Sequence, residues 1–373
     1  MEKTILVINK FCPLHPKAGG AEKNLLEIFS RLGKRHHIYL LAAMFPGAKK
    51  EEIYKNIHIF RLGKSYSGNI VRIHFLIPFY LKKFLKKLKP DILFEDISVL
   101  PFFTPLFYPH QKKIIMIHAF NRKHFFTSQR FLFALIAWVV ESLFLIFYRQ
   151  EKVIVVSDWM KKILLKNGFK NVYKVLNGVD SHFFGLRKEY ASKPTVLFLG
   201  RLEGRKGIDL FLKTYPLVKE KITEVKYIIA GQEFSFGSRR LLKFLKKYKE
   251  NYSSEEIEFF GYVSEEKKSE LFKSSWVYVM PSRIEGYGIS VLEANATGTF
   301  VIANNVEGLK ESVINNKTGI LIDCGDTLMF SQAIVNWLNI EKLKTKENLC
   351  RQWAKKHNWD KSTMEIENLI YEK

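Results

Sequence analysis

The sequence predicts an α/β protein with two doubly wound domains, each built on a parallel sheet. Short apolar runs of strand length alternate with longer stretches of helical periodicity, which is typical of parallel sheets. This alternation runs through the first half of the chain and starts again at residues 195–199. The length of 373 residues also exceeds what one ordinary hydrophobic core needs.

The first half contains apolar runs that predict buried strands, at residues 5–8, 37–43, 57–61, 92–95, 114–117 and 153–156. The run at 5–8 is too short for a signal peptide, so we expect it to be the first strand. Helical patterns lie between several of these runs, at residues 21–29, 73–88 and 131–148. Ser157 or Asp158 is expected to cap a further helix. We place the first domain at residues 1–185.

The second half repeats the pattern, with predicted strands at residues 195–199, 226–230, 257–259, 276–280, 300–303 and 319–322. A polar stretch at 187–193 precedes the first of these strands. We therefore place the domain boundary near residues 183–194 and the second domain at residues 194–355.

The composition points to an anionic partner. The chain has 60 Lys and Arg against 37 Asp and Glu, a formal charge of +23. Such an excess suits a nucleic acid, a membrane surface or a phosphorylated substrate, although it can also serve solubility alone. Cys12, Cys324 and Cys350 lie far apart, without metal-ligand spacing, and this usage fits a reducing cytoplasm.

The most informative segment runs from Glu285 to Glu293. It follows an apolar run and a Pro-Ser turn, and it reads as a tight glycine turn and a helix that bears the second carboxylate. Such a turn can aim backbone N–H groups and a helix N-terminus at an anion. The carboxylates can accept hydrogen bonds from hydroxyls attached to that anion. A phosphate grip beside two hydroxyl acceptors suits a sugar nucleotide.

This segment resembles the E-x7-E motif of the retaining glycosyltransferases of family 4. The resemblance implies that Glu285 lies near the donor sugar and that Glu293 binds ribose hydroxyls. Tyr287 takes the aromatic position of the motif, and Gly286 and Gly288 permit close approach of the backbone to phosphate. The family fold is GT-B, in which two Rossmann-like domains face each other across a cleft. The resemblance also implies that residues 356–373 form a helix that crosses back to the N-terminal domain.

Other segments of the chain, from Gly19 onward, also resemble motifs of this family. They occur along the chain in the same order as in the family. Residues 200–207 resemble its G-R-x-x-x-x-K-G signature after the first strand of the second domain. Arg201 and Lys206 would stabilise the negative charge of the departing diphosphate without a metal. Residues 260–263 resemble the loop whose backbone contacts the base, which makes Gly261 and Val263 donor-binding residues. Gly231-Gln232-Glu233 departs from the usual G-x-G pattern.

The N-terminal domain contributes Gly19-Gly20-Ala21-Glu22, which resembles the G-G-x-E loop of the family, with the amide of Gly20 facing the diphosphate. His118 follows a predicted strand, where the family has a His that contacts the donor sugar. Ala119 replaces the acidic residue that usually follows it. The nearby polar residues Asn121, Arg122 and Lys123 are candidates for holding an acceptor phosphate.

Two stretches raise the question of a membrane. Residues 131–148 approach the length of a transmembrane helix but contain Glu141 and Ser142, so they form a buried, an interfacial or a spanning helix. Residues 72–89 mix large apolar side chains with basic ones, as in helices that lie on anionic membranes, or they are a solvated basic face. The candidate membrane contacts in that stretch are Arg72, Lys82, Lys83, Lys86 and Lys87.

These observations predict a retaining glycosyltransferase that moves a hexose from a nucleotide diphosphate sugar to a lipid-linked or glycan acceptor. We expect it to need no metal or other cofactor and to lie in the cytoplasm, peripherally on the inner face of the cell membrane. The alternatives are a sugar-nucleotide epimerase of the same fold, a basic nucleic-acid-binding protein and an inactive sugar-nucleotide-binding scaffold. Release of free nucleotide only in the presence of an acceptor would argue against an epimerase. No nucleic-acid module is recognisable in the sequence.

Overall fold

The computed structural model describes the chain except for residues 65–68, 98–99, 119–130, 233–238, 324 and 373. It divides into two compact units. Unit 1 contains Met1–Gly178 and Trp359–Lys373, and unit 2 contains Val179–Asn358. The division thus lies at Gly178, a few residues before the predicted boundary, and unit 1 is made of two separate stretches of chain.

Unit 1 is built on an eight-stranded sheet with the order β3-β4-β2-β1-β5-β6-β7-β8. Its strands are β1 (Thr4–Ile8), β2 (His37–Ala43), β3 (Glu51–Tyr54), β4 (Ile57–Leu62), β5 (Ile92–Ile97), β6 (Lys113–Ile117), β7 (Lys152–Val155) and β8 (Asn171–Lys174). All neighbours pair in parallel except β3, which runs antiparallel to β4. The purely parallel sheet that the sequence predicts is therefore modified at one edge.

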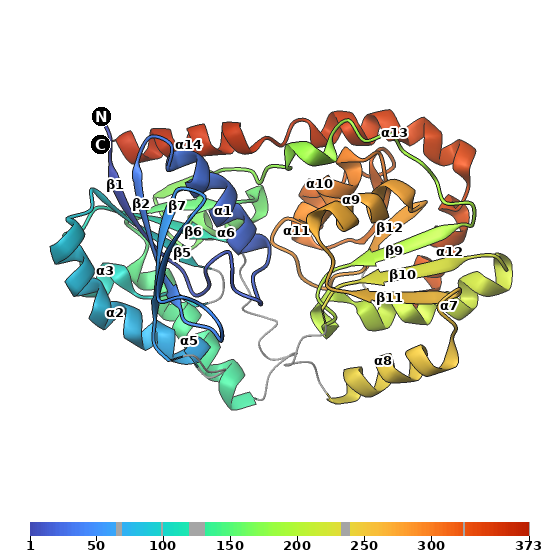
Figure 1. Ribbon diagram of the computed structural model, residues 1–373, viewed down its shortest axis with the longest axis horizontal. Coiled ribbons are helices and arrows are strands. Elements are labelled where there is room, and N and C mark those ends of the chain that lie inside the picture. The colour runs from blue at the N-terminus through green and yellow to red at the C-terminus, as the bar shows by residue number, and fades with distance from the viewer. Residues whose placement is uncertain (65–68, 98–99, 119–130, 233–238, 324, 373) are drawn as a thin grey trace. The chain divides into compact units, whose positions relative to one another are not determined.

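Among the described residues, the helices of unit 1 are α1 (Gly20–Leu32), α2 (Asn69–Leu88), α3 (Thr104–Phe107), α5 (Phe131–Phe147), α6 (Asp158–Lys166) and α14 (Trp359–Tyr371) (Figure 1). On α2, Ile73, Ile77 and Leu81 are buried against strands β1 and β2. At a separate cluster, α5 and α6 pack on β6 and β7. Ser157 caps α6, as predicted, because its Oγ accepts a hydrogen bond of 3.2 Å from the amide of Met160.

The last helix, α14, completes unit 1 by packing along α1. Glu367 of α14 pairs with Arg35 at 2.6 Å and with His36 at 2.9 Å, just after α1 ends. On the same helix, Ser362 donates a 2.6 Å hydrogen bond to the carbonyl of Leu176. These contacts join the C-terminal stretch to the part of unit 1 made near the start of the chain.

Unit 2 is built on a six-stranded parallel sheet with the order β11-β10-β9-β12-β13-β14. Its strands are β9 (Thr195–Leu199), β10 (Lys226–Ala230), β11 (Ile257–Gly261), β12 (Val277–Met280), β13 (Phe300–Asn304) and β14 (Gly319–Ile322). Its helices are α7 (Ile208–Lys221), α8 (Arg239–Asn251), α9 (Glu265–Ser274), α10 (Ile289–Ala296), α11 (Glu307–Ser312), α12 (Thr327–Trp337) and α13 (Ile340–Ala354).

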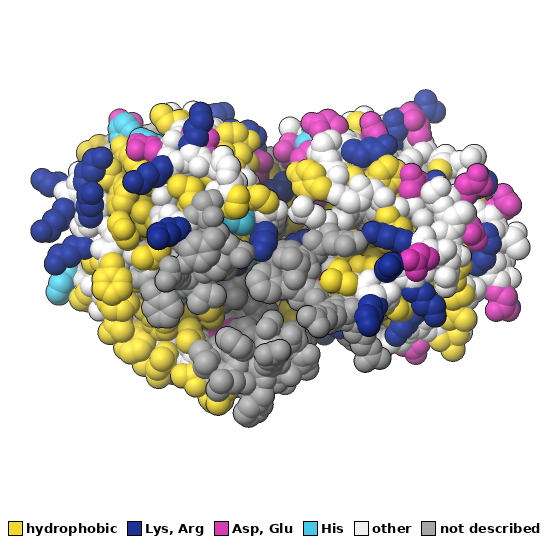
Figure 2. Space-filling view, turned by 60° about the horizontal axis from the view of Figure 1, so that its bottom comes forward, with side chains coloured by type: hydrophobic (Ala, Val, Ile, Leu, Met, Phe, Trp, Pro, Cys, Tyr) yellow, Lys and Arg dark blue, Asp and Glu magenta, His cyan; other side chains and the backbone are white. Residues whose placement is uncertain are grey.

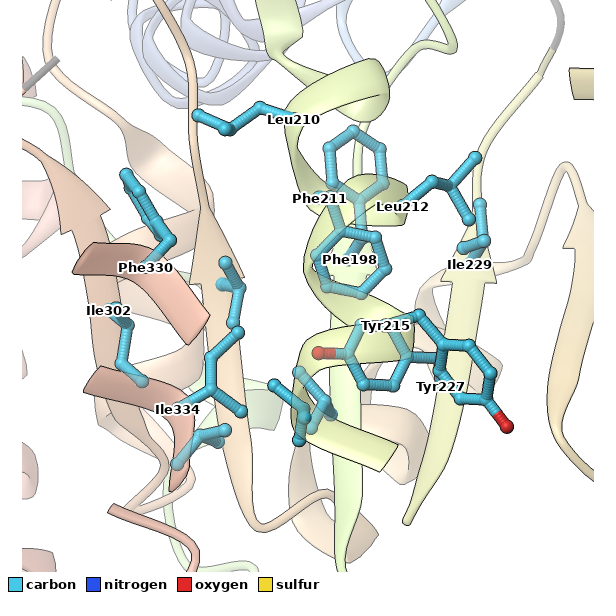
Figure 3. Close-up of a cluster of buried hydrophobic side chains, with 14 of the residues drawn as sticks. Phe198, Leu210, Phe211, Leu212, Tyr215, Tyr227, Ile229, Ile302, Phe330 and Ile334 are labelled. Carbon is cyan, nitrogen blue, oxygen red and sulfur yellow. The ribbon is translucent and has the colours of Figure 1, made fainter. Parts of the chain in front are cut away.

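The core of unit 2 is rich in aromatic side chains. Phe211 of α7 packs on Phe198 of β9 and on Tyr227 of β10, with ring centroids 5.4 and 4.7 Å apart (Figure 3). Phe330 and Ile334 of α12 belong to the same buried cluster. Burial of such large side chains fixes α7 and α12 against the sheet. The loops at the carboxyl ends of the strands are thereby held on a rigid base.

The described residues include no helix that is both long and apolar enough to cross a membrane.

Candidate active site

The two segments that the sequence singles out in unit 2 follow neighbouring strands. The chain builds β9, β10 and β11 toward one edge and then β12, β13 and β14 toward the other, so the order reverses between β9 and β12. Ligands of doubly wound sheets bind at the carboxyl ends of the strands that flank such a reversal. Residues 200–207 follow β9 and residues 281–288 follow β12, which brings the two segments together there.

Lys206 and Glu285 form an ion pair between these two segments. Both side chains are largely buried. Burial alone would raise the pKa of Glu285, but the adjacent ammonium of Lys206 more than offsets that effect and holds the pKa below its ordinary value. Burial lowers the pKa of Lys206, and Glu285 limits the decrease. The structure thus joins two predicted catalytic residues that are far apart in sequence.

Arg283 fastens the same two segments to each other. Its guanidinium donates two hydrogen bonds of 2.8 Å to the carboxylate of Asp209 on α7, and its amide donates to the carbonyl of Arg205 at 2.8 Å. Gly207 has a φ of +74°, and a Cβ there would lie 2.1 Å from the carbonyl oxygen of Pro281. Only glycine allows this approach. The position of Lys206 is therefore set by packing as well as by its ion pair.

Arg201 lies at the start of the first segment, with its side chain partly exposed. Its Nε is 3.8 Å from Glu203 Oε1, and Arg205 lies nearer the same oxygen, at 2.7 Å. The segment therefore presents several cations around one acidic side chain. This concentration of positive charge suits a diphosphate.

Glu293 on α10 is buried and paired, with only 3% of its side chain exposed. Lys268 of α9 places its Nζ 3.1 Å from Oε1 and 3.0 Å from Oε2. The same ammonium lies 2.8 Å from Glu265 and 5.1 Å from the ring centre of Phe183. A buried carboxylate normally needs such a partner. Glu293 thus lies in a charged cluster inside unit 2 rather than on a solvent-facing side of its helix.

The turn between these carboxylates is built by Gly286, Tyr287 and Gly288. Gly288 caps α10 with a φ of +87°, which favours glycine at this position. Tyr287 is buried, and its hydroxyl donates a 2.8 Å hydrogen bond to Nε2 of His357, whose Nδ1 donates to the carbonyl of Trp353 at 3.1 Å. Burial lowers the pKa of His357 to about 4, so this histidine is neutral and can accept. The donor-binding roles of these turn residues stay predictions.

Gly261 and Val263 lie at the same edge of the sheet, two strands away from β9. Gly261 ends β11, and its carbonyl accepts a 2.6 Å hydrogen bond from the amide of Gly231. Val263 is partly buried. The contact of Gly261 and Val263 with the nucleotide base stays a prediction.

Unit 1 brings its own candidates to the carboxyl edge of its sheet, where the strand order reverses between β1 and β5. Gly20 is the first residue of α1, and Gly19 is its N-cap. The carboxylate of Glu22 accepts a 2.7 Å hydrogen bond from the amide of Gly19, so the loop before the helix is tied to its first turn. The predicted phosphate contact of Gly20 remains a prediction.

His118 follows β6 and lies against Asp96 of β5, with 2.6 Å between Nε2 and Oδ1. Since a carboxylate accepts, Nε2 carries the proton and donates it. Asn9 supports the pair with a 3.3 Å hydrogen bond from Nδ2 to the other oxygen of Asp96. Burial lowers the pKa of His118, but the attraction of Asp96 and Glu22 outweighs burial and raises it above its ordinary value.

We expect Asp96→Asn to lower the pKa of His118, which NMR titration of the imidazole would measure. Because the folded-state pKa is raised, the pair stabilises the fold fully below the ordinary pKa of about 6.5 and loses that effect as pH rises through the folded value. Asp96→Asn should remove this pH dependence from urea unfolding. In a His118→Asn background, Asp96→Asn should leave the pH dependence of urea unfolding unchanged. An unaltered pKa of His118 in the Asp96→Asn variant would contradict the assignment.

Some of the residues predicted from the sequence are not among those that the structure describes. Asn121, Arg122, Lys123 and Glu233 fall outside the described residues, as does Cys324. Arg72 lies in α2, but its side chain is not described. The other predicted membrane residues are on the exposed side of α2, namely Lys82, Lys83, Lys86 and Lys87.

Sequence reasoning missed the partners of the predicted residues. Lys268 lies among other charged residues at the start of α9, a pattern that normally indicates a solvated helix face. Asp96 lies inside an apolar strand, and a carboxylate in such a run is the one signal that could have drawn attention to it. Arg283 offered no signal, because its partner Asp209 is distant in the chain.

Comparison with family models decides the class of the protein. Residues 184–357 match the model described as glycosyl transferases group 1, and residues 18–183 match the model described as glycosyltransferase family 4. The chain belongs to this glycosyltransferase family. The two matched regions together cover most of unit 1 and nearly all of unit 2 of the glycosyltransferase.

Curated relatives of this glycosyltransferase carry similar names. Two uncharacterized glycosyltransferases of Methanocaldococcus jannaschii are 27% identical over 60% of the chain and 59% of the relative, and 26% identical over 95% of both. The phosphatidyl-myo-inositol mannosyltransferase of Mycobacterium leprae is 29% identical over 51% of the chain and 50% of the relative. The alignments with the first and third of these relatives thus span 59% and 50% of the relatives' lengths.

Solved structures show that the glycosyltransferase has the GT-B fold. The sucrose-phosphate synthase of Thermosynechococcus elongatus gives a TM-score of 0.83 at 19% identity, over 99% of this chain and 98% of the other. Anabaena HepE, in complex with UDP and glucose, gives 0.73 at 16% identity over 100% of both chains. At these identities the likeness concerns the fold alone.

Proposed function

We propose that this glycosyltransferase moves a hexose from a nucleotide diphosphate sugar to a lipid-linked or glycan acceptor, with retention of the anomeric configuration. The observation that supports it best is the ion pair between Lys206 and Glu285 at the strand reversal of unit 2. It places a cation and a carboxylate together where a doubly wound sheet binds its ligand. Arg201 adds a second cation on the same segment.

In the proposed reaction, the bond between the anomeric carbon and the leaving diphosphate breaks while a bond to the acceptor oxygen forms on the same face of the sugar. The acceptor proton passes to an oxygen of the departing diphosphate. Lys206 and Arg201 stabilise the charge that grows on the diphosphate, so the reaction needs no metal. Glu285 lies at the sugar, and Glu293 accepts hydrogen bonds from the ribose hydroxyls. His118 of unit 1 contacts the sugar, held by Asp96.

A lipid-linked acceptor is supported by charge and by the relatives. Lys82, Lys83, Lys86 and Lys87 are exposed on one helix, and each lysine near an anionic surface contributes about 1 kcal/mol of binding. The mannosyltransferase of Mycobacterium leprae acts, by its name, on a phosphatidylinositol lipid. We place the protein on the cytoplasmic face of the membrane, since cysteine usage suits a reducing compartment.

A thermal-shift panel of UDP-, GDP- and ADP-hexoses tests the donor. We expect one nucleotide sugar to raise the melting temperature, because a ligand at 100 times its Kd adds about 2.7 kcal/mol of stability. The Arg201→Ala variant should lose most of that shift. If no nucleotide sugar shifted the wild-type protein at millimolar concentration, the proposed donor class would be wrong.

The sugar-nucleotide epimerase remains the second candidate, because the same donor site would serve it. The two activities differ in their need for an acceptor. A transferase releases nucleoside diphosphate only when an acceptor is present, whereas an epimerase converts the donor without one. Product analysis of the donor that gives the largest thermal shift separates them.

A further inference from the structure

Unit 1 exposes many large apolar side chains on three of its helices. We call this surface the apolar face (Figure 2). Its members are Phe79 and Tyr80 of α2, Leu106 and Phe107 of α3, and Leu135, Trp138, Val139, Leu143, Ile146 and Phe147 of α5. Exposure ranges from 38% for Phe147 to 80% for Phe79. Apolar patches of this extent on a protein surface indicate a binding site.

Contacts between the helices show that these side chains form one surface. Tyr108, just after α3, donates a hydrogen bond to the carbonyl of Pro78 in α2. Phe103, just before α3, packs on Phe147 of α5 with ring centroids 6.3 Å apart. The short helix α3 therefore connects the middle of α2 to the end of α5.

Helix α5 is apolar on the side where a surface helix is normally polar. Its exposed apolar positions fall at helical spacing on one stripe, from Leu135 to Phe147. On the opposite side, the described positions Glu141, Phe144 and Leu145 are buried, and Glu141 is the only carboxylate in the sequence of the helix. An ordinary surface helix buries its apolar stripe and exposes its charges. Helix α5 therefore suits contact with an apolar medium rather than with water.

The apolar face rests on a firm base. Glu95 of β5 is fully buried and accepts hydrogen bonds of 2.7 Å from the hydroxyl of Tyr148, at the end of α5, and from the amide of Phe102. It also accepts from the hydroxyl of Thr104, which begins α3. One buried carboxylate thus anchors both helices to the sheet, and the outward direction of the apolar face follows from this anchoring.

The charge around the apolar face favours an anionic partner. Residues 63–90 and 97–140 contain no Asp or Glu at all. Lys82 and Lys83 are exposed on the same side of α2 as Phe79, because they follow it by three and four residues. Two copies of this protein meeting through this surface would bring two lysine-bearing surfaces together, and neither of these two stretches supplies a carboxylate to pair with the lysines. An anionic lipid bilayer instead offers acyl chains to the apolar side chains and phosphates to the lysines.

We propose that the apolar face inserts into the boundary between headgroups and acyl chains of an anionic phospholipid bilayer, with Trp138 and its α5 neighbours entering the membrane. This goes beyond surface attraction by the α2 lysines, which needs no insertion. The inference rests on the proposed membrane attachment of the transferase. Vesicle binding is measured without donor or acceptor, so a failed donor panel and a failed insertion test are distinguishable.

The test of insertion uses the full chain and vesicles of phosphatidylcholine and phosphatidylglycerol with brominated acyl chains. Bromine quenches only tryptophans that reach the acyl region. We expect quenching in the wild-type protein that is lost in Trp138→Phe, while vesicle binding is largely kept. Quenching per bound molecule should persist at high salt, where the lysines are screened. Binding without quenching that depends on Trp138 would overturn the proposal and leave electrostatic adsorption.

A variant pair gives the matched control. Val139→Asp combined with Ile146→Asp should reduce vesicle co-sedimentation by about tenfold or more, because both side chains would have to carry charge into the membrane. Leu217→Asp combined with Leu328→Asp changes two exposed leucines of unit 2 and should bind as the wild type does. Equal binding by the wild type and the α5 pair would refute insertion. A dimer that the α5 pair abolishes, without quenching of Trp138, would favour a second copy as the partner.

Lys82, Lys83, Lys86 and Lys87 changed together to Glu separate the two contributions. This variant should lose most binding to anionic vesicles, but the fraction that still binds should show the same quenching of Trp138. If the bound molecules of this variant showed no quenching of Trp138, insertion would make no contribution to binding that is independent of the lysines. Circular dichroism melts of all variants verify that the substituted proteins are folded.

Discussion

Lys206→Ala should lower turnover by about 10²- to 10³-fold, the loss expected when one preorganised group that stabilises transition-state charge is removed. The substitution also leaves Glu285 buried without its ammonium partner, so the folded protein should become less stable. Steady-state kinetics with the donor identified by thermal shift measure the first effect, and urea unfolding measures the second. Arg201→Ala should reduce turnover similarly with a smaller loss of stability, since its side chain is more exposed.

Arg205→Ala is the matched control for this loss of turnover. Arg205 lies on the same segment, is partly exposed and pairs with Glu203 at 2.7 Å, but it does not contact Glu285 through an ion pair. Turnover should fall much less than in Lys206→Ala. Equal losses of turnover in the two variants would mean that the overall positive charge of the segment matters, rather than the position of the Lys206 ammonium. Near-normal turnover in Lys206→Ala would show that Lys206 has no role in the reaction.

Glu293→Gln should weaken donor binding more than it slows the reaction of bound donor. Hydrogen bonds to charged groups contribute about 1.5–3 kcal/mol, which corresponds to a tenfold to hundredfold increase in Kd. The buried carboxylate also neutralises Lys268, so the variant should melt at a lower temperature. Calorimetric titration with the donor measures the affinity. Glu285→Gln should instead depress turnover, because that residue is placed at the sugar.

Glu265→Gln serves as the control for Glu293→Gln. Glu265 pairs with the same lysine at 2.8 Å, but its side chain is half exposed. Donor affinity should be close to that of the wild type. If Glu265→Gln weakened the donor as much as Glu293→Gln did, the effect would come from Lys268, and unchanged affinity in Glu293→Gln would end the ribose assignment.

The strands that the sequence predicted are the ones with apolar runs, and the two that it missed are both at the edges of the unit 1 sheet. Strand β3 reads Glu-Glu-Ile-Tyr, and β8 reads Asn-Val-Tyr-Lys. An edge strand is covered less than a central one, so its residues need not be apolar. Central strands are buried on both faces, and for that reason their runs were recognisable.

Helix α5 shows why periodicity could not decide its environment. A stretch with one polar and one apolar stripe reveals which stripe is buried, but both stripes of α5 are largely apolar. The sequence therefore left a buried, an interfacial or a spanning helix open. The structure distinguishes the stripes through long-range contacts, such as the hydrogen bond from Tyr148 to Glu95.

The position of the candidate catalytic residues on the chain was predictable, and their partners were not. Strand ends and glycine turns are local features, so the segments around Lys206 and Glu285 could be located by pattern. Pairing with Lys268 or Asp96 depends on how helices and strands are placed in the tertiary fold. Spacing along a sequence does not contain that information.

The division of unit 1 between the two ends of the chain affects how the protein can be synthesised. A ribosome finishes the eight strands of the first sheet long before it makes α14, because all of unit 2 is translated in between. Until then, His36 and Arg35 lack Glu367, and the side of α1 that α14 covers stays open to solvent or to a chaperone. A premature stop just before α14 would therefore damage the first unit to be made, while unit 2 would keep its whole sequence.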